Sequence, residues 1–370
     1  MVAPERRRRV TISDVAKHAG VSKAAVSKVI RNDYGVSQAM RDRVKRAIDE
    51  LGYRPQAAAR ALRGRAFTIG VLMQHIGIPF YAEIVTGLVD ELAESEYQAI
   101  MIQGGTRDKT EKRAIDALID RQVDGILMIA PLAARTHLEQ VAREIPTLVL
   151  GRHDRSPAYD SIVDDDRVGS ELVMEHLIGL GHRRIGHITF DKEHGQAADR
   201  TPQIRAETYE RVMREHDLAG EIAVATTSYT EEGGYDGARE LLGRSPRPTA
   251  IFAGSDEAAL GVLAALHEAG LSVPGDVSVA GYDNTKLAAH PNIALTTVNQ
   301  DGVVMGRTAG RLLLERIEGR TSAAHFSVIP SLVVRRSTAS PRPCPAGTET
   351  QMPARTVRDV TAADAVRRRG

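Results

Sequence analysis

Residues 21–30 read VSKAAVSKVI, a stretch with two lysines and two serines among small and aliphatic side chains. Its aliphatic residues repeat at the i, i+3, i+4 spacing of one helix face: Val26, Val29 and Ile30. Ser22 can cap the start of a helix, and Ala24 and Lys28 fall on the opposite face. The spacing therefore predicts a short helix that is apolar on one side and basic on the other.

Helices are also predicted on both sides of this stretch. Thr11 can cap a helix over residues 12–19 that stops at Gly20, and Ser37 can cap a third helix. Helix, tight glycine turn and second helix is the geometry that presents the second helix to the major groove of DNA. We therefore predict an all-α helix-turn-helix head over residues 10–54.

The outer face of the second helix would enter a groove about 12 Å wide. Alanine permits close approach there, lysine offers donors to guanine or phosphate, and serine at the helix edge can hold a phosphate. The DNA contacts predicted within the head are Thr11, Ser22, Lys23, Ala24, Ser27, Lys28 and Arg31.

The charge distribution separates this head from the rest of the chain. Residues 1–65 carry 16 Lys or Arg against 6 Asp or Glu, a surplus of +10, whereas the remaining residues balance at −9. A basic head on an acidic body favours a polyanionic partner for the head alone. Cys344 is the only cysteine, and no signal peptide or long apolar run is present, so we expect a cytoplasmic protein that does not enter a membrane.

The body is predicted from an alternation of apolar runs with amphipathic stretches, which is typical of parallel sheets wrapped by helices. Four runs are predicted to form one sheet and four later runs another: TIGVLM, YQAIMI, DGILMIA and PTLVLG, then RRIGHITF, EIAVATTS, TAIFAG and VSVAGYD. Ligands of such folds bind outside the carboxyl ends of the strands. We therefore expect a two-lobed α/β body with a ligand cleft over residues 66–340.

The segments TISDVAKHAGVSKAAVSKVI and LGYRPQAAARALRGRAFTIGVL resemble the LacI/GalR family of transcriptional regulators, and the resemblance extends to about residue 340. In that family the stretch matching RPQAAARAL is a hinge helix that folds on operator DNA and enters its minor groove. The resemblance implies a hinge and linker over residues 55–65, in which Ala59 and Leu62 contact DNA. Leu62 falls at the position whose leucine wedges between base pairs, where an apolar wedge repays unstacking by bending the duplex.

Several positions depart from the usual family pattern. Ala25 stands where a threonine is frequent, Lys28 where an arginine is frequent, and Gln56 where an asparagine often starts the hinge. Lysine lacks the bidentate fork of arginine, so base discrimination at Lys28 is expected to be weaker or differently aimed.

The resemblance also implies a periplasmic-binding-protein-like core with an effector between its lobes. The implied effector-binding residues are Gln74, Phe80, Tyr81, Asp165, Arg205, Tyr229, Ser255, Asp256 and Asp283. A one-residue shift would put Asp164 in the place of Asp165. Charged groups suit vicinal hydroxyls and aromatic faces cover a sugar ring, so a sugar is the first expectation and a purine or nucleoside the alternative.

No catalytic motif competes with this interpretation. The histidines of MEHLIGLGHRRIGHI fit helix-to-strand packing, and no nucleophile–base, metal-binding or phosphate-binding pattern is found in the sequence. We therefore predict no enzyme activity, no metal and no cofactor. Residues 1–9 are expected to be a basic arm, and residues 341–370 a disordered, Pro-rich tail.

Together these features predict a DNA-binding regulator, in this family most often a repressor, controlled by a small-molecule effector. It is expected to bind a pseudo-palindromic operator as a homodimer, with a tetramer left open, because one small head offers few base contacts. A solute-binding protein of the same body fold is the alternative from another class, and the basic head argues against it.

Overall fold

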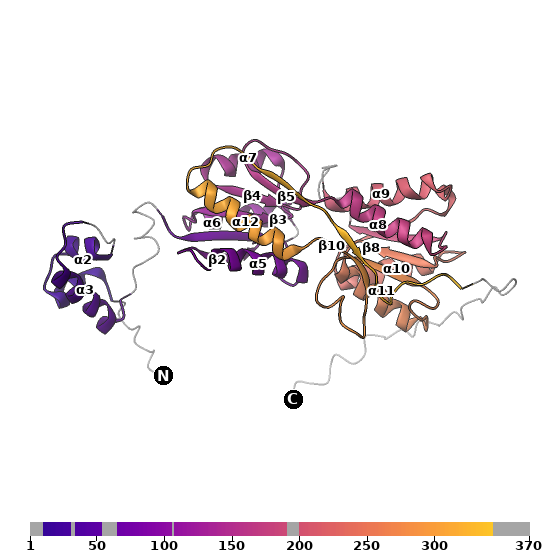
Figure 1. Cartoon of the computed structure of the whole chain (residues 1–370), viewed down its shortest axis with the longest axis horizontal. Helices are drawn as coiled ribbons and strands as arrows, with labels where there is room; N and C mark the ends of the chain where they lie inside the picture. Colours follow the sequence, from indigo (N-terminus) through magenta and orange to yellow (C-terminus); the bar gives the residue numbers. More distant parts are fainter. Residues whose placement is uncertain (1–9, 31–33, 54–64, 106, 191–199, 343–370) are drawn as a thin grey trace, which may run out of the picture.

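The computed structural model describes residues 10–30, 34–53, 65–105, 107–190 and 200–342. Figure 1 shows a small helical head, followed by a body in which two α/β lobes lie end to end. No helix in these ranges is both long enough and apolar enough to span a membrane.

The head consists of three helices: α1 (Ile12–Ala19), α2 (Lys23–Ile30) and α3 (Gln38–Leu51). Their predicted ends are confirmed. Thr11 accepts from the Asp14 amide in a reciprocal capping box, Gly20 ends α1 in the left-handed region at φ 63°, and Ser37 caps α3. The buried centre is built by all three helices and by the tyrosine two residues after α3: Val15, Ala16, Val26, Val29, Val44, Ala47 and Tyr53.

The first lobe, the N lobe, contains a sheet of six parallel strands in the order β11-β5-β4-β3-β1-β2. The strands are β1 (Thr68–Met73), β2 (Gln98–Gln103), β3 (Gly125–Ile129), β4 (Thr147–Leu150), β5 (Asp160–Asp164) and β11 (His325–Val328). One face is covered by α5 (Pro79–Leu92) and α12 (Gly302–Ile317), and the other by α6 (Asp108–Ile119) and α7 (Arg135–Glu144). Both faces are buried hydrophobic cores, which explains the apolar runs of β1, β3 and β4.

The second lobe, the C lobe, contains a sheet in the order β12-β10-β9-β8-β6-β7, parallel except for β12. The strands are β6 (Ile185–Phe190), β7 (Ala223–Thr227), β8 (Ala250–Ala253), β9 (Ser278–Asp283), β10 (Thr296–Asn299) and β12 (Ser331–Val333). Helices α10 (Glu231–Leu242) and α11 (Asp256–Glu268) cover one face, and α8 (Asp166–Gly179) and α9 (Thr201–Glu215) the other, with a 3₁₀ turn at Ala219–Glu221.

The chain crosses between the lobes three times. It crosses after β5, again between β10 and α12, and a last time between β11 and β12. The eight predicted strands and their division into two sheets are confirmed, whereas β5, β10, β11 and β12 were not predicted as strands. These four lie at the two crossing edges of the sheets, so they carry the connections between lobes (Figure 1).

Candidate functional sites

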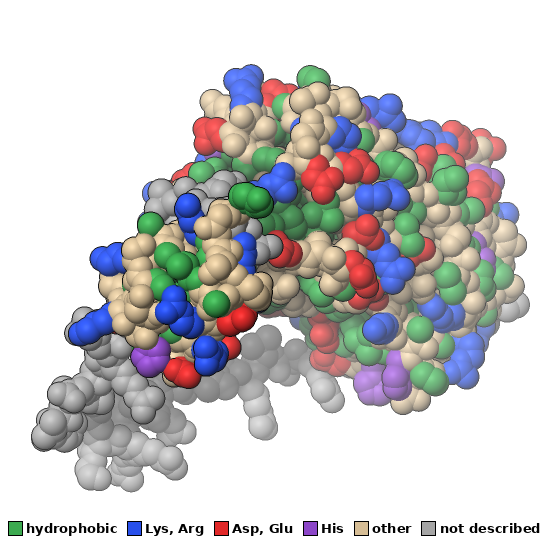
Figure 2. All heavy atoms as spheres, turned by 60° about the vertical axis from the view of Figure 1, so that its left-hand side comes forward, with side chains coloured by type: hydrophobic (Ala, Val, Ile, Leu, Met, Phe, Trp, Pro, Cys, Tyr) green, Lys and Arg blue, Asp and Glu red, His purple; other side chains and the backbone are tan. Residues whose placement is uncertain are grey.

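The outer face of α2 is exposed, as predicted. Lys23, Ala24 and Lys28 are exposed and Ser27 is half-buried, while Val26 and Val29 point into the head. Figure 2, with the head in front, shows Lys and Arg side chains spread over its surface. The sequence had suggested this combination of a buried apolar face and an exposed basic one from spacing alone.

Two predicted contact residues also hold the helices in place. Ser22 Oγ accepts from the Ala25 amide at 3.1 Å, and Thr11 Oγ1 donates to Asp14 Oδ2 at 2.7 Å. Their hydroxyls therefore fix the starts of α2 and α1, where helix amides can approach a phosphate. Arg31, Ala59 and Leu62 lie outside the described residues, so their proposed contacts rest on the sequence.

Replacing Lys28 with alanine is predicted to weaken operator binding by about 1–3 kcal/mol if the lysine reads a base. The preference at one position of each half-site should then relax, while the fold of the head is unchanged because Lys28 is exposed. Binding to a set of single-base operator variants checks this. A loss that is equal for every variant would show that Lys28 contacts phosphate instead.

A cavity of about 190 Å³ lies between the lobes, at the carboxyl ends of the strands of both sheets. This is smaller than the roughly 300–1,000 Å³ of sites for drug-sized ligands, so it suits a compact ligand. Seven of the nine predicted effector residues line it: Gln74, Phe80, Tyr81, Arg205, Tyr229, Ser255 and Asp283.

The other two predicted residues are elsewhere. Asp164, the last residue of β5, lines the cavity, whereas Asp165 caps α8 by accepting from the Val168 amide at 3.2 Å. The structure therefore places Asp164, as in the one-residue alternative, in the cavity wall, and an effector contact of Asp164 stays a prediction. Asp256 also does not line the cavity.

Asp256 binds the chain around it instead of facing the cavity. Its carboxylate accepts from the Thr285 amide at 2.7 Å, the Thr285 hydroxyl at 3.0 Å and the Thr297 hydroxyl at 2.5 Å. These bonds tie the start of α11 to β10 and to the segment after β9. Asp256 thus supports the cavity from behind.

Other lining residues were not predicted, among them Arg152, Phe190, Arg200, Gln203 and Gln300. Arg152 and Phe190 follow or end predicted strands, so the rule that strand ends converge on the ligand could have found them. Gln300 follows β10, a strand that had not been recognised. Arg200 precedes α9 and carries no comparable sequence signal.

The Arg205 guanidinium is one of the deeply buried polar groups of the site. Its Nε donates to Asp166 Oδ1 at 2.6 Å and its Nη1 to the Gly254 carbonyl at 2.6 Å. It also lies over the Tyr282 ring, with its Cζ 3.4 Å from the centroid. Its side chain is only 3% exposed. The ion pair with Asp166, the hydrogen bond to Gly254 and the contact with the Tyr282 ring together hold the guanidinium in one position.

Two carboxylates beside Arg205 have opposite pKa shifts. Burial opposes the ionisation of Asp166, but the Arg205 guanidinium and His153 outweigh it and hold the pKa of Asp166 below its usual range. Burial raises the pKa of Asp164 to about 7, and the nearby Asp166 carboxylate adds to this rise. Tyr282 Oη donates to Asp164 Oδ2 at 2.6 Å. Asp166 is therefore the ionised partner of Arg205, whereas the protonation state of Asp164 can change near neutral pH.

Asp283 is held in an unusual way at the end of β9. Its φ of 121° lies where side-chain-bearing residues are rare, and Gln300 Nε2 donates to its Oδ1 at 2.5 Å. Burial raises its pKa well above the usual range, and the Asp256 carboxylate pushes in the same direction. Strained backbone at a cavity wall is typical of residues placed for ligand contact.

The raised pKa of Asp164 predicts a pH dependence of stability. A group whose pKa rises on folding stabilises the fold most below its unfolded pKa, and this contribution is lost as pH rises through the folded pKa of about 7. Between roughly pH 4 and pH 7, the free energy of unfolding should fall with rising pH more steeply in wild type than in Asp164→Asn, by at most roughly 1.4 kcal/mol per pH unit. Urea unfolding of both proteins across this range tests it; parallel curves would contradict it.

The cavity thus combines ionisable oxygens, a fixed guanidinium and aromatic faces, which can bind a small polar ligand from both lobes at once. Within the described ranges, no cluster of His, Cys, Asp and Glu could hold a metal ion. A helix-turn-helix head joined to such a body defines the class of ligand-responsive DNA-binding proteins.

Comparison with known proteins specifies this class. Residues 11–56 match the family of bacterial regulatory proteins described as the lacI family, and residues 174–338 match a periplasmic binding protein-like domain. The ribose operon repressor of Escherichia coli (strain K12) is 35% identical over 339 residues, which cover 89% of this chain and 99% of that protein. The chain therefore belongs to the LacI family, and it is a DNA-binding transcriptional regulator.

Two further relatives agree with this assignment. The HTH-type transcriptional repressor PurR of Yersinia pestis (strain Pestoides F) is 35% identical, over 89% of this chain and 97% of that protein. The crystal structure of the lac repressor dimer bound to operator and the anti-inducer ONPF has a TM-score of 0.74 at 27% identity, covering 90% of this chain and 100% of that one. The predicted fold class, a helical head on a periplasmic-binding-protein-like α/β body, is confirmed.

Proposed function

We propose that this regulator binds a pseudo-palindromic operator as a homodimer in the cytoplasm, and that a sugar in the interlobe cavity controls its affinity for DNA. Residues 10–54 bind the major groove of the operator, and residues 55–65 connect this head to the body. Residues 66–340 bind the effector and form the dimer contact. The ribose operon repressor is among its relatives, which supports a repressor and a sugar.

The observation that supports a sugar as the effector is the combination of acidic side chains and aromatic rings in the cavity wall. Asp164 and Asp283, one from each lobe, can accept from hydroxyl groups, and Arg205 can donate to them. Phe80 and Tyr229 offer rings that can cover an apolar sugar face. A compact polyhydroxy ligand satisfies these groups together. The similarity to PurR keeps a purine as the second candidate.

A thermal-shift panel of pentoses, hexoses and purine bases on the whole protein tests the effector class. A ligand that binds only the folded state at 100 times its Kd stabilises it by about 2.7 kcal/mol, so the correct class should raise the Tm. Asp283→Asn keeps the size of the side chain and should remove most of the shift. A rise with purines alone would select the second candidate, and no rise with any sugar at millimolar concentration would reject the first.

The same panel should then be applied to operator binding. A sugar that raises the Tm is expected to change the operator Kd of wild type by about 5–150-fold, the usual range of coupling between two sites. A sugar that binds without changing the operator Kd would be a ligand but not an effector.

A further inference from the structure

The chain enters the N lobe from the head at residues 65–68, where several hydrogen bonds hold it. The amides of Ala66 and Thr68 donate to the two carboxylate oxygens of Asp124, at 2.9 Å and 3.0 Å. The Arg65 guanidinium donates to the backbone carbonyl of Ile317 at 3.2 Å. These contacts fix the position from which the segment leading to the head leaves the body.

Ile317 is the last residue of α12, and the other end of that helix lies at the cavity. Met305, in its first turn, lines the cavity, and Gln300, just before the helix, lines it and holds Asp283. The helix has 16 residues and therefore spans about 24 Å. One straight element thus connects the cavity wall with the Arg65 contact.

Helix α12 packs closely on its neighbour α5. It packs on α5 through Gly302, Gly306 and Gly310, one helical turn apart. A Cβ built at Gly306 would lie 1.9 Å from the Ile84 carbonyl oxygen, and one built at Gly87 of α5 would lie 2.0 Å from the Val303 carbonyl oxygen. Because the two backbones are this close, we expect the two helices to move together.

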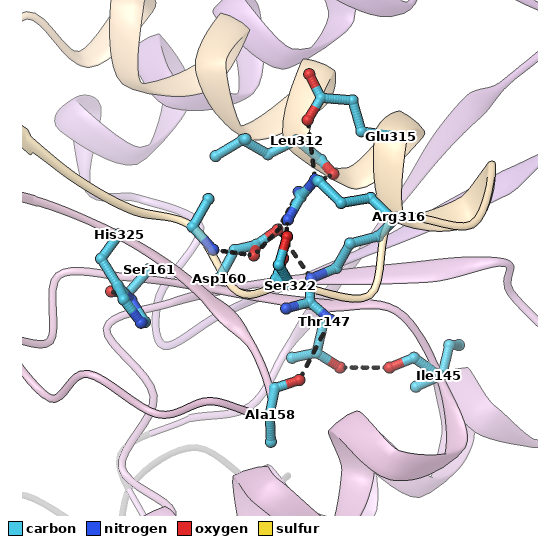
Figure 3. Close-up of polar contacts among 12 residues, drawn as sticks. Ile145, Thr147, Ala158, Asp160, Ser161, Leu312, Glu315, Arg316, Ser322 and His325 are labelled. Atoms are coloured by element: carbon cyan, nitrogen blue, oxygen red, sulfur yellow. Dashed lines mark hydrogen bonds and ion pairs between the residues drawn. The ribbon is translucent and has the colours of Figure 1, made fainter.

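The far end of α12 is also tied to β5, as Figure 3 shows. The buried Asp160 carboxylate pairs with Arg316 Nε at 2.9 Å and Arg320 Nη2 at 2.7 Å, and accepts from the Ala324 amide at 2.8 Å. Asp160 begins β5, and the same strand ends at Asp164 in the cavity. Two elements therefore run from the cavity to this charged cluster, which joins them beside the Arg65 contact.

Resting on the proposed control of DNA affinity by a cavity ligand, we propose that α12, packed on α5, couples the cavity to the DNA-binding head, and that the contact between Arg65 and Ile317 transmits a displacement of α12 to the segment that leads to the head. A ligand that displaces Gln300 or Met305 moves α12 as a rigid body. Arg65 then moves with the carbonyl of Ile317, the last residue of α12, to which it donates. Coupling between two sites is reciprocal, so operator binding must also change the conformation or stability of the cavity end of α12.

Hydrogen exchange of the full-length protein, with and without an operator duplex selected from a random library, tests this without any sugar. In wild type, operator binding is expected to change the exchange of amides 300–306. Arg65→Ala removes an exposed side chain and should bind the operator within about fivefold of wild type. At saturating operator, its change at residues 300–306 should be largely lost.

The matched control is Arg307→Ala, which breaks an exposed pair with Asp90 at 3.0 Å on the same helix. It should retain the wild-type change at residues 300–306. The proposal is overturned if Arg65→Ala transmits the full change, if wild type shows none, or if Arg65→Ala loses operator binding more than about tenfold and so behaves as a DNA contact. Operator binding and the sugar panel remain separate readouts of the proposed function.

Discussion

Arg205→Ala is expected to lower the free energy of unfolding by about 3–5 kcal/mol, because it removes the buried cation that pairs with the Asp166 carboxylate and leaves only His153 beside it. Asp166 has a fully buried side chain and lies 2.6 Å from Arg205 Nε, and Asp164 lies close by in the same apolar surroundings. Urea unfolding near neutral pH measures the loss. The protein that remains folded should also fail to bind the effector.

Two variants make this result specific. Arg211→Ala removes another arginine of α9, whose pairs with Glu171 and Glu215 are partly exposed, and should cost no more than about 1 kcal/mol. Arg205→Met combined with Asp166→Leu removes both buried charges and should recover much of the stability without restoring ligand binding. If Arg205→Ala costs as little as Arg211→Ala, the ion pair does not hold the site together.

Gly306→Ala should destabilise the N lobe by about 3 kcal/mol, at the upper end of the cost of overpacking a core. Alanine favours a helix by about 1 kcal/mol over glycine, so the sign of the effect separates packing from helix propensity. The new methyl group would lie 1.9 Å from the Ile84 carbonyl oxygen, and only separation of α5 from α12 can relieve that contact.

Gly179→Ala is the matched control, since it also lies in a helix, α8, but a Cβ there has nothing within 4 Å. It should be neutral or slightly stabilising. Thermal and urea unfolding of both variants decide the question. A stabilised Gly306→Ala would mean that the helices are free to separate, which would also remove the rigidity on which the coupling through α12 depends.

The head could be predicted almost to the residue because its signals are local. Thr11, Gly20 and Ser37 act within one helical turn of where they stand, and the structure uses each of them at the predicted helix end. The central strands β1, β3, β4, β6, β8 and β9 were equally accessible, since a strand buried on both faces must be apolar along its length.

The four strands at the crossing sides of the sheets, β5, β10, β11 and β12, could not be found in this way. β10 reads TTVN and β11 reads HFSV, short and half-polar sequences whose strand state depends on a partner far away in the chain. The same limit applies to the two aspartates at the end of β5, Asp164 and Asp165. Whether Asp164 or Asp165 faces the cavity depends on the residue at which the strand ends and α8 begins, and that is set by tertiary packing.

The three crossings between lobes also set an order for biosynthesis. The head needs only residues 10–53 for its core, so it can pack early on the ribosome. The N lobe, although it comes next, lacks α12 and β11 until residue 328 has been made, after nearly all of the C lobe. Until α12 has been made, the side of α5 around Ile84 and Leu88 that packs on it has no cover. The lobe nearest the start of the chain is therefore completed among the last, and a nascent chain carries a folded DNA-binding head well before it can respond to any ligand.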